Sequence, residues 1–264
     1  MVTDQGGLLV VAGHAIYQDG AWHGGYPGEE KIYQGHLVDG VKLSRTRGYD
    51  ALVLSGGHTR DRAPGFPSAT VTNSEAAGLA ELLADLHLQR RQAPPVLQEP
   101  LARDSFENLL FAMLCYHRHL GRWPCRVGVV SWKFKALRYY MIASGLGLGQ
   151  GRFTFHGSGD LTGAVGTEAA AVASVVSDAA MVEHVLEGGR PALFDPLQRA
   201  GRPFGAKRAE RMPWRFQGNA EYMAEVKAAY DPAPGGGEVS RLLDTVEALG
   251  PGQVWREVRW PWQV

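Results

Sequence analysis

The sequence has no excess of charge of either sign. Its 264 residues include 27 lysines and arginines and 27 aspartates and glutamates, so the formal net charge is zero at pH 7. A protein that binds nucleic acid or an anionic membrane through a general electrostatic field normally has a positive excess. We therefore expect no nucleic-acid partner and no membrane partner.

Cysteine is almost absent as well. Only Cys115 and Cys125 occur, and their spacing matches neither a zinc site nor a redox-active pair. Cys115 lies in the middle of an apolar helical pattern. The sequence therefore predicts no bound metal and a reducing, cytoplasmic location.

Long apolar runs and several well-known motifs are also missing. No segment reaches the roughly 18 consecutive apolar residues of a membrane-spanning helix, and residues 1–7 lack the basic start of a secretion signal. The phosphate-binding patterns GxGxxG and GxxxxGK[ST], the metalloprotease pattern HExxH and the hydrolase pattern GxSxG do not occur. The absence of these motifs therefore argues against a standard dinucleotide-binding protein, a kinase-type enzyme or a serine hydrolase.

Short apolar runs alternate with helical patterns through the first part of the chain. Apolar or β-branched segments separated by helix-length amphipathic segments are typical of β-α-β units with right-handed crossovers. The sequence predicts an α/β protein, a Rossmann-like three-layer sandwich around a mainly parallel five-stranded sheet. The predicted strands are 8–12, 51–54, 94–99, 126–131 and 152–156, and the predicted helices are 29–48, a helix after Glu75, a helix after Asp104, and 134–144.

The composition and pattern of the sequence change after these alternating strands and helices. We assign residues 1–165 to the Rossmann-like domain and 166–264 to a helical accessory region packed on it. This region is predicted to contain an Ala/Val-rich helix at 167–187, a Pro/Gly/Arg segment at 188–213, and helices at 219–230 and 240–249.

Polar residues gather at the predicted carboxyl ends of the strands. In open parallel sheets, ligands bind outside these ends because loops from several strands meet there. The residues that this argument brings to one edge are Gly13, His14, Ser55, Gly56, Gly57, His58, Thr59, Arg60, Glu99, Ser131, Lys133 and Lys135.

The glycine pair after the second strand fits anion binding. Two glycines let the backbone approach a ligand and present amide donors, although an ordinary tight turn has the same composition. Thr59 and the guanidinium of Arg60 strengthen the anion interpretation. Arg60 also fits a solvated surface charge.

Two carboxylates have both a structural and a functional interpretation. Glu75 can complete a capping box with Thr72 at a helix start, or it can face the pocket. Glu99 ends a strand in apolar surroundings, where a carboxylate needs a partner. We expect that partner to be Lys135, Arg138 or a ligand hydroxyl.

The remaining candidates lie at helix starts. Ser105, Glu107 and Asn108 can be plain caps, although Asn108 lies one turn into its helix. Lys135 and Arg138 are three residues apart and are predicted to project from one helix face, as anchors for an anion or as a solvated basic face.

His14 is the candidate with the most open role. A histidine at a strand exit can act as a general acid or base, can hydrogen-bond a sugar hydroxyl, or can be structural. With Glu75 and Glu99 it completes the set of candidate catalytic groups.

The order of these residues resembles a known family. The series Ser55-Gly56-Gly57, Ser74-Glu75-Ala76, Glu99, Ser105 to Asn108 and Ser131-x-x-Phe134-x-x-x-Arg138 is similar to the YdcF/SanA/ElyC family, domain of unknown function 218, over residues 8–157. The phrases VAGHAIY, VSWKFK and KRAERMP look closest to its cytosolic fungal-type branch.

The resemblance implies a Rossmann-like fold with a polar cleft, and S-adenosylmethionine binding is associated with the family. The matching positions are Ser55, Gly56, Gly57, Glu75, Glu99, Glu107, Asn108 and Arg138. Ser105 stands where the family usually has threonine, and Lys135 stands where many members have histidine. A histidine-based mechanism therefore does not transfer to this chain.

The leading hypothesis is a Rossmann-like protein, and an enzyme if chemistry occurs, that binds a nucleotide-like anionic small molecule such as S-adenosylmethionine. As an enzyme it would be a transferase dependent on that cofactor or a hydrolase of a phosphorylated or glycosylated metabolite. The alternative from another class is a non-catalytic protein with a vestigial cleft, whose C-terminal region binds another polypeptide. That alternative gains support if Trp214, Trp255, Trp260 and Trp262 are exposed together.

Overall fold

The computed structural model describes residues 6–25, 27–58, 71–88, 93–158, 220–231, 237–248 and 258–263. These residues fall into two compact units. The described residues up to 158 form the first unit, except 145–147, which group with 220–263 in the second. The domain boundary expected near 165, the helix expected at 167–187 and the segment 188–213 lie outside the described residues.

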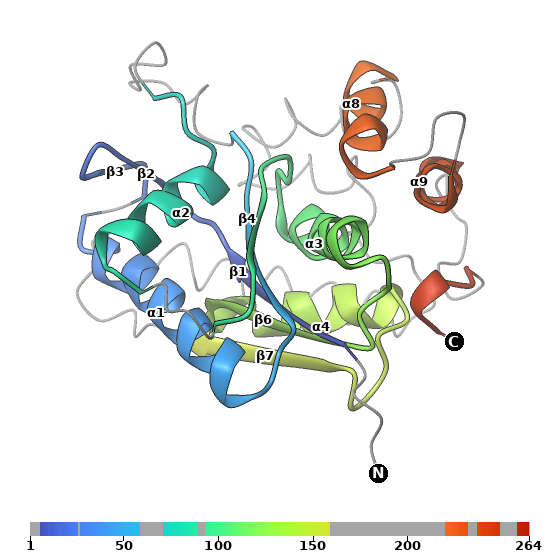
Figure 1. The fold of residues 1–264 in the computed structure, drawn as a ribbon, viewed down its shortest axis with the longest axis horizontal. Coiled ribbons are helices and arrows are strands. Elements are labelled where there is room, and N and C mark those ends of the chain that lie inside the picture. The colour runs from blue at the N-terminus through green and yellow to red at the C-terminus, as the bar shows by residue number, and fades with distance from the viewer. Residues whose placement is uncertain are drawn as a thin grey trace. The chain divides into compact units, whose positions relative to one another are not determined.

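The first unit is built on a five-stranded parallel sheet, as predicted. The strand order is β5-β4-β1-β6-β7 (Figure 1). Every strand predicted from the sequence is present, with ends shifted by at most two residues. The strands are β1 (Gly7–Ala12), β4 (Ala51–Ser55), β5 (Val96–Glu99), β6 (Arg126–Trp132) and β7 (Phe153–Ser158).

Helices cover both faces of this sheet (Figure 1). Helices α1 (Glu30–Thr46) and α2 (Glu75–Asp85) lie on one face, and α3 (Ser105–Leu120) and α4 (Ala136–Gly145) lie on the other. The α/β class and the Rossmann-like sandwich are therefore confirmed. The helix predicted at 134–144 differs at its start, because Lys133–Lys135 form the short 3-10 helix η1 before α4 begins.

The apolar core fixes which side chains face which helices. Leu9, Val11, Leu52, Leu54 and Val130 belong to a buried cluster shared with side chains of α1 and α2. Side chains alternate between the two faces of a strand. The neighbours of these residues, including Ser55 and Ser131, therefore point to the face covered by α3 and α4.

The strand order creates a switch point between β1 and β6. From β1 the chain proceeds outward through β4 to β5, and α3 then returns it to the other side of β1, where β6 pairs. Connections leave the two central strands in opposite directions here, which opens a crevice at their carboxyl ends. Gly13 and His14 follow β1 at this point, and Lys133 follows β6.

The starts of α3 and α2 are capped by different residues. Asp104 caps α3, since its Oδ1 accepts hydrogen bonds from the amides of Phe106 (2.9 Å) and Glu107 (3.1 Å). The capping box predicted for Thr72 and Glu75 is wrong. Ser74 is the N-cap of α2, and its Oγ accepts from the Ala77 amide at 3.0 Å.

A two-stranded hairpin precedes α1 and was not predicted. Strands β2 (Ile16–Gln18) and β3 (Ala21–His23) pair antiparallel around Asp19 and Gly20, which have φ values of 53° and 78°. Positive φ at both central residues defines the tight turn for which Asp-Gly is a strong signal. The hairpin is fastened to α2 by the bond from Tyr17 Oη to Asp85 Oδ2 (2.9 Å).

The second unit contains the predicted helices near its middle. They are α8 (Ala220–Tyr230) and α9 (Glu238–Ala248), and a short 3-10 helix, η4 (Pro261–Gln263), lies near the C-terminus. Asp231, directly after α8, accepts hydrogen bonds from the amides of Gly237 (2.8 Å) and Ser240 (3.0 Å) at the start of α9. Within the described ranges, no helix combines the length and apolar character needed to cross a membrane.

Replacing the α3 cap gives a test of the fold. We expect Asp104→Ala to lower the free energy of unfolding by about 1 kcal/mol, because two helix amides lose their acceptor. Asp104→Ser keeps a capping oxygen and should lose less than half as much. Urea denaturation of both variants measures the difference, and equal losses would contradict the capping role.

Candidate functional site

The sheet register aligns the polar residues at the carboxyl ends of the strands. Ser55 pairs with Ala12 on one side and with Glu99 on the other. Ser131 directly follows Val130, the partner of Val11, so it continues the same row. Residues in one row of a parallel sheet point to the same face, and this row faces α3 and α4.

Ser55, Glu99 and Asn108 form a buried hydrogen-bonded group. Ser55 Oγ lies 2.6 Å from Glu99 Oε2 and 2.9 Å from Asn108 Oδ1. Ser55 Oγ also lies 3.3 Å from Asn108 O, and a hydroxyl has a single proton to donate, so these acceptors share it. Ser55 and Glu99 thus lie at one edge of the sheet, and Asn108 of α3 joins them there.

Glu99 is held by the protein itself. It is fully buried, and its Oε1 accepts hydrogen bonds from the amides of Leu101 (2.7 Å) and Ala102 (3.0 Å). Charge-assisted bonds of this kind stabilise a buried carboxylate. Together with Ser55, the two amides supply compensation that we expected from Lys135 or Arg138.

Glu107 is similarly engaged. Its Oε2 accepts from the backbone amide (2.8 Å) and Nε (3.0 Å) of Arg103, and its Oε1 accepts from Arg103 Nη2 at 2.7 Å. This bidentate ion pair ties the loop after β5 to α3. The interactions described for Glu107 therefore favour a structural role over contact with a ligand.

Glu75 lies against two glycines instead of completing a cap. A Cβ atom at Gly13 would come within 2.7 Å of Glu75 Oε2, and one at Gly56 would come within 2.6 Å of the same oxygen. Glu75 is buried at the first position of α2. Its carboxyl group thus lies where the loops after β1 and β4 meet.

The glycine amides do not offer the free donors that we expected for an anion. Gly56 N donates to Glu99 O at 2.9 Å, Gly57 N donates to Ala102 O at 2.6 Å, and Gly13 N donates to Ser55 O at 2.7 Å. These bonds link the loops after three strands. The glycines are needed for close packing here, and anion binding through the amides of Gly56 and Gly57 is not supported.

His14 connects β1 with the segment after β6. Its Nε2 lies 3.1 Å from Ser131 Oγ, and its Nδ1 lies 3.1 Å from Lys135 Nζ. An ammonium group can only donate. With Lys135 charged, Nδ1 therefore accepts, the ring is neutral, and the proton on Nε2 is donated to Ser131.

A second histidine, which sequence reasoning missed, lies beside this ring. The His36 and His14 rings are in edge contact, with centroids 5.4 Å apart. His36 is buried, and its Nε2 lies 3.3 Å from Ser158 O. Burial lowers its pKa to about 4, the bond to Ser158 acts in the opposite direction, and the charge of Lys135 lowers it further. His36 therefore stays neutral near pH 7. The only signal in the sequence was its place on the buried stripe of α1.

The remaining predicted residues are placed as follows. Ser105 and Arg138 are buried, at the starts of α3 and α4 respectively. Lys135 ends η1 and is partly exposed, so it and Arg138 do not share one α-helix as predicted. Thr59 and Arg60 lie outside the described residues.

The two cysteines are free. Burial raises the pKa of the Cys115 thiol to about 12, with Glu99 raising it further and Arg118 lowering it. Thiolate chemistry at Cys115 is therefore disfavoured near neutral pH. The described ranges contain no group of three or more metal-binding side chains.

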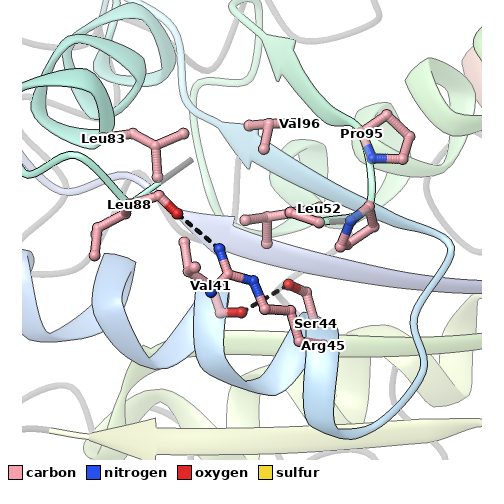
Figure 2. Close-up of a pocket in the computed structure, with 10 residues that line it drawn as sticks. Val41, Ser44, Arg45, Leu52, Leu83, Leu88, Pro95 and Val96 are labelled. Atoms are coloured by element: carbon pink, nitrogen blue, oxygen red, sulfur yellow. Dashed lines mark hydrogen bonds between the residues drawn. The ribbon is translucent and has the colours of Figure 1, made fainter. Parts of the chain in front are cut away.

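A separate cavity of about 230 Å³ lies near the amino ends of β4 and β5 (Figure 2). Its lining includes Leu52, Leu83 and Val96, and Arg45 crosses it to donate a hydrogen bond to Leu88 O at 2.7 Å. The predicted polar site is at the carboxyl ends of the strands. This cavity is therefore distinct from it.

Comparison with protein-family models, with curated proteins and with solved structures found no match to this chain. The resemblance to the YdcF/SanA/ElyC family therefore stays a prediction from the motifs.

Gly56 gives a test of the close packing around Glu75. Its φ is 153°, which other residues rarely adopt, and its Cβ would clash with Glu75. We expect Gly56→Ala to lower the free energy of unfolding by about 1–3 kcal/mol. Gly35→Ala is the matched control, since a Cβ there meets nothing within 4 Å, and it should stabilise α1 by about 0.5–1 kcal/mol. A neutral Gly56→Ala would contradict this packing.

The pKa of His36 predicts how stability depends on pH. Because this pKa falls from 6.5 to about 4 on folding, the unfolded chain binds a proton between these values that the folded protein does not. Stability should therefore fall as the pH drops through this window, by up to about 3 kcal/mol from His36. Urea unfolding at pH 7.5 and 5 should show a smaller loss for His36→Gln than for the unaltered protein. Identical losses would exclude His36 as the cause.

Proposed function

We propose that this chain binds a small anionic, nucleotide-like ligand at the carboxyl edge of its sheet, at the switch point between β1 and β6. One observation carries the proposal. Lys135 and Ser131, from the β6 side, both hydrogen-bond the ring of His14, from the β1 side. A cation, a hydroxyl and an imidazole are thus gathered at the position where doubly wound sheets bind their ligands.

Lys135 supplies the positive charge in this proposal. An ammonium group has three N–H donors, and one of them donates to His14 Nδ1 at 3.1 Å. It is partly exposed, whereas Arg138 is 5% exposed. The phosphate or carboxylate of the ligand would lie against Lys135. With the amides of Gly56 and Gly57 engaged elsewhere, the proposal places more weight on this side chain than the sequence alone did.

The candidate acid–base groups differ in how they are held. Glu99 accepts hydrogen bonds from Ser55 and two backbone amides, and Glu75 is wedged between Gly13 and Gly56. The carboxyl groups of Glu99 and Glu75 are therefore both held in place by contacts within the protein. His14 is partly exposed, and both of its ring nitrogens are already hydrogen-bonded to side chains that can exchange protons or charge with it, Ser131 and Lys135. If the protein is an enzyme, His14 is the group best placed for proton transfer.

The ligand class covers nucleoside phosphates and S-adenosylmethionine, because each joins an anionic group to a nucleoside. The motif resemblance to the YdcF/SanA/ElyC family supports the second. A transferase would release S-adenosylhomocysteine, and a hydrolase would release phosphate or sugar, so product analysis separates the two reactions.

The alternative hypothesis, a C-terminal region that binds another polypeptide, depended on exposed tryptophans, and two of these four are buried. Trp260 and Trp262 are buried and stacked, with centroids 5.2 Å apart. Their indole N–H groups donate to the carbonyls of Gly145 (3.1 Å) and Leu146 (2.6 Å) in the same unit. They are therefore not an exposed aromatic surface. Trp214 and Trp255 lie outside the described residues.

Lysine variants test the proposed site. We expect Lys135→Ala to weaken binding of adenosine monophosphate or S-adenosylmethionine by about 10–100-fold, as for the loss of one charge-assisted hydrogen bond. Lys133→Ala is the control, because Lys133 belongs to the same short helix and is exposed. Calorimetric titration measures the dissociation constants. Equal affinities in the two variants, or no binding of either ligand by the unaltered protein, would reject the site.

A further inference from the structure

The hydroxyl of Tyr139 is buried without a hydrogen-bond partner. Tyr139 is 1% exposed, and its ring stacks on Phe155 with centroids 5.5 Å apart. Its oxygen forms no hydrogen bond of normal distance and angle in the described part of the chain. Buried hydroxyl groups nearly always have a partner, so this one requires an explanation.

Three polar side chains lie near this hydroxyl. Burial raises the pKa of Tyr139, while the neighbouring side chains of Ser105 and Asn108, the charge of Arg138 and the side chain of Ser131 lower it. These residues come from α3 and β6, and Tyr139 comes from α4. Ser105 and Asn108 are 6% and 7% exposed, so the cluster is not completely closed.

The cluster around the Tyr139 hydroxyl contains groups that can donate hydrogen bonds. Asn108 Oδ1 accepts from Ser55 Oγ, which leaves the NH₂ end of the amide to donate. Serine and tyrosine hydroxyls can both donate and accept. Groups that both donate and accept suit a ligand hydroxyl, which does the same, better than an apolar group.

The cluster adjoins the proposed anion site. Ser131 belongs to both, since its Oγ is bonded to His14 and its side chain lies beside the Tyr139 hydroxyl. A ligand with its anionic group at Lys135 would therefore have its next polar atoms close to Tyr139.

We propose that Tyr139, Ser105 and Asn108 form a subsite that hydrogen-bonds the sugar hydroxyls of the ligand. The inference rests on the proposed function and narrows it to ligands in which a ribose or similar sugar carries the anionic group. Tyr139 is then a residue that determines specificity, because its hydroxyl finds its partner only when the sugar is bound.

The test pairs two ligands with two tyrosine variants. The unaltered protein should bind adenosine 5′-monophosphate at least fivefold more tightly than its 2′,3′-dideoxy analogue. In Tyr139→Phe this ratio should fall to about one. Tyr140→Phe is the matched control, since Tyr140 is the next residue along the chain and is 51% exposed, and it should keep the full ratio.

Each outcome bears on a different proposal. If Lys135→Ala weakens binding of the nucleotide but Tyr139→Phe keeps the ligand ratio, the sugar subsite is overturned and the proposed function stands. If the unaltered protein binds adenosine monophosphate but does not discriminate between the two ligands, the subsite is again overturned. If the unaltered protein does not bind adenosine monophosphate at all, both the sugar subsite and the proposed nucleotide site are rejected.

Thermal unfolding adds a readout that needs no ligand. Removing an unpartnered buried hydroxyl should leave the melting temperature of Tyr139→Phe unchanged or raise it. A fall of more than a few degrees relative to Tyr140→Phe would mean that the hydroxyl is bonded within the protein. That result would also overturn the subsite.

Discussion

The register of the parallel sheet determines where the polar groups of the proposed site lie. Leu54 must face the apolar core shared with α1 and α2, and because side chains alternate, Ser55 must face α3 and α4. The pairing of Ser55 with Ala12 and Glu99 then sets the row of groups beneath the crevice. A shift of one residue would exchange the two faces and bury polar groups in the apolar core. Hydrophobic burial thus positions residues that are themselves polar.

The carboxylates in this region act mainly on the protein around them. Glu99 and Glu107 accept hydrogen bonds from backbone amides at the loop between β5 and α3. Glu75 occupies the space left by the absent side chains of Gly13 and Gly56. These contacts make the loops rigid relative to the sheet. A rigid frame reduces the conformational entropy that a ligand must remove on binding.

The sequence was sufficient for the features that depend on periodicity and strand ends. The five parallel strands, the Rossmann-like class, the Asp104 cap and the position of Ser55 and Glu99 at one edge of the sheet were predictable from apolar runs and their termini. The Asp19-Gly20 turn carried a clear signal that was overlooked.

Other features depend on contacts between distant parts of the chain. The amides of Thr72 and Asn73 donate to Gln18 Oε1 of the hairpin, so Ser74 caps α2 although Thr72 fits the local pattern. Tyr139 and Tyr140 cannot be told apart in the sequence. Their environments depend on the phase of α4, which the preceding 3-10 turn helps to set.

The anchoring of the chain on both sides of residues 59–70 has a consequence for engineering. On one side the Gly57 amide is bonded to Ala102 O, and on the other the Thr72 and Asn73 amides are bonded to Gln18. Both attachment points belong to the folded unit. Loop-closure cost grows only slowly with length. Insertions and library diversification between these two points should therefore spare the sheet.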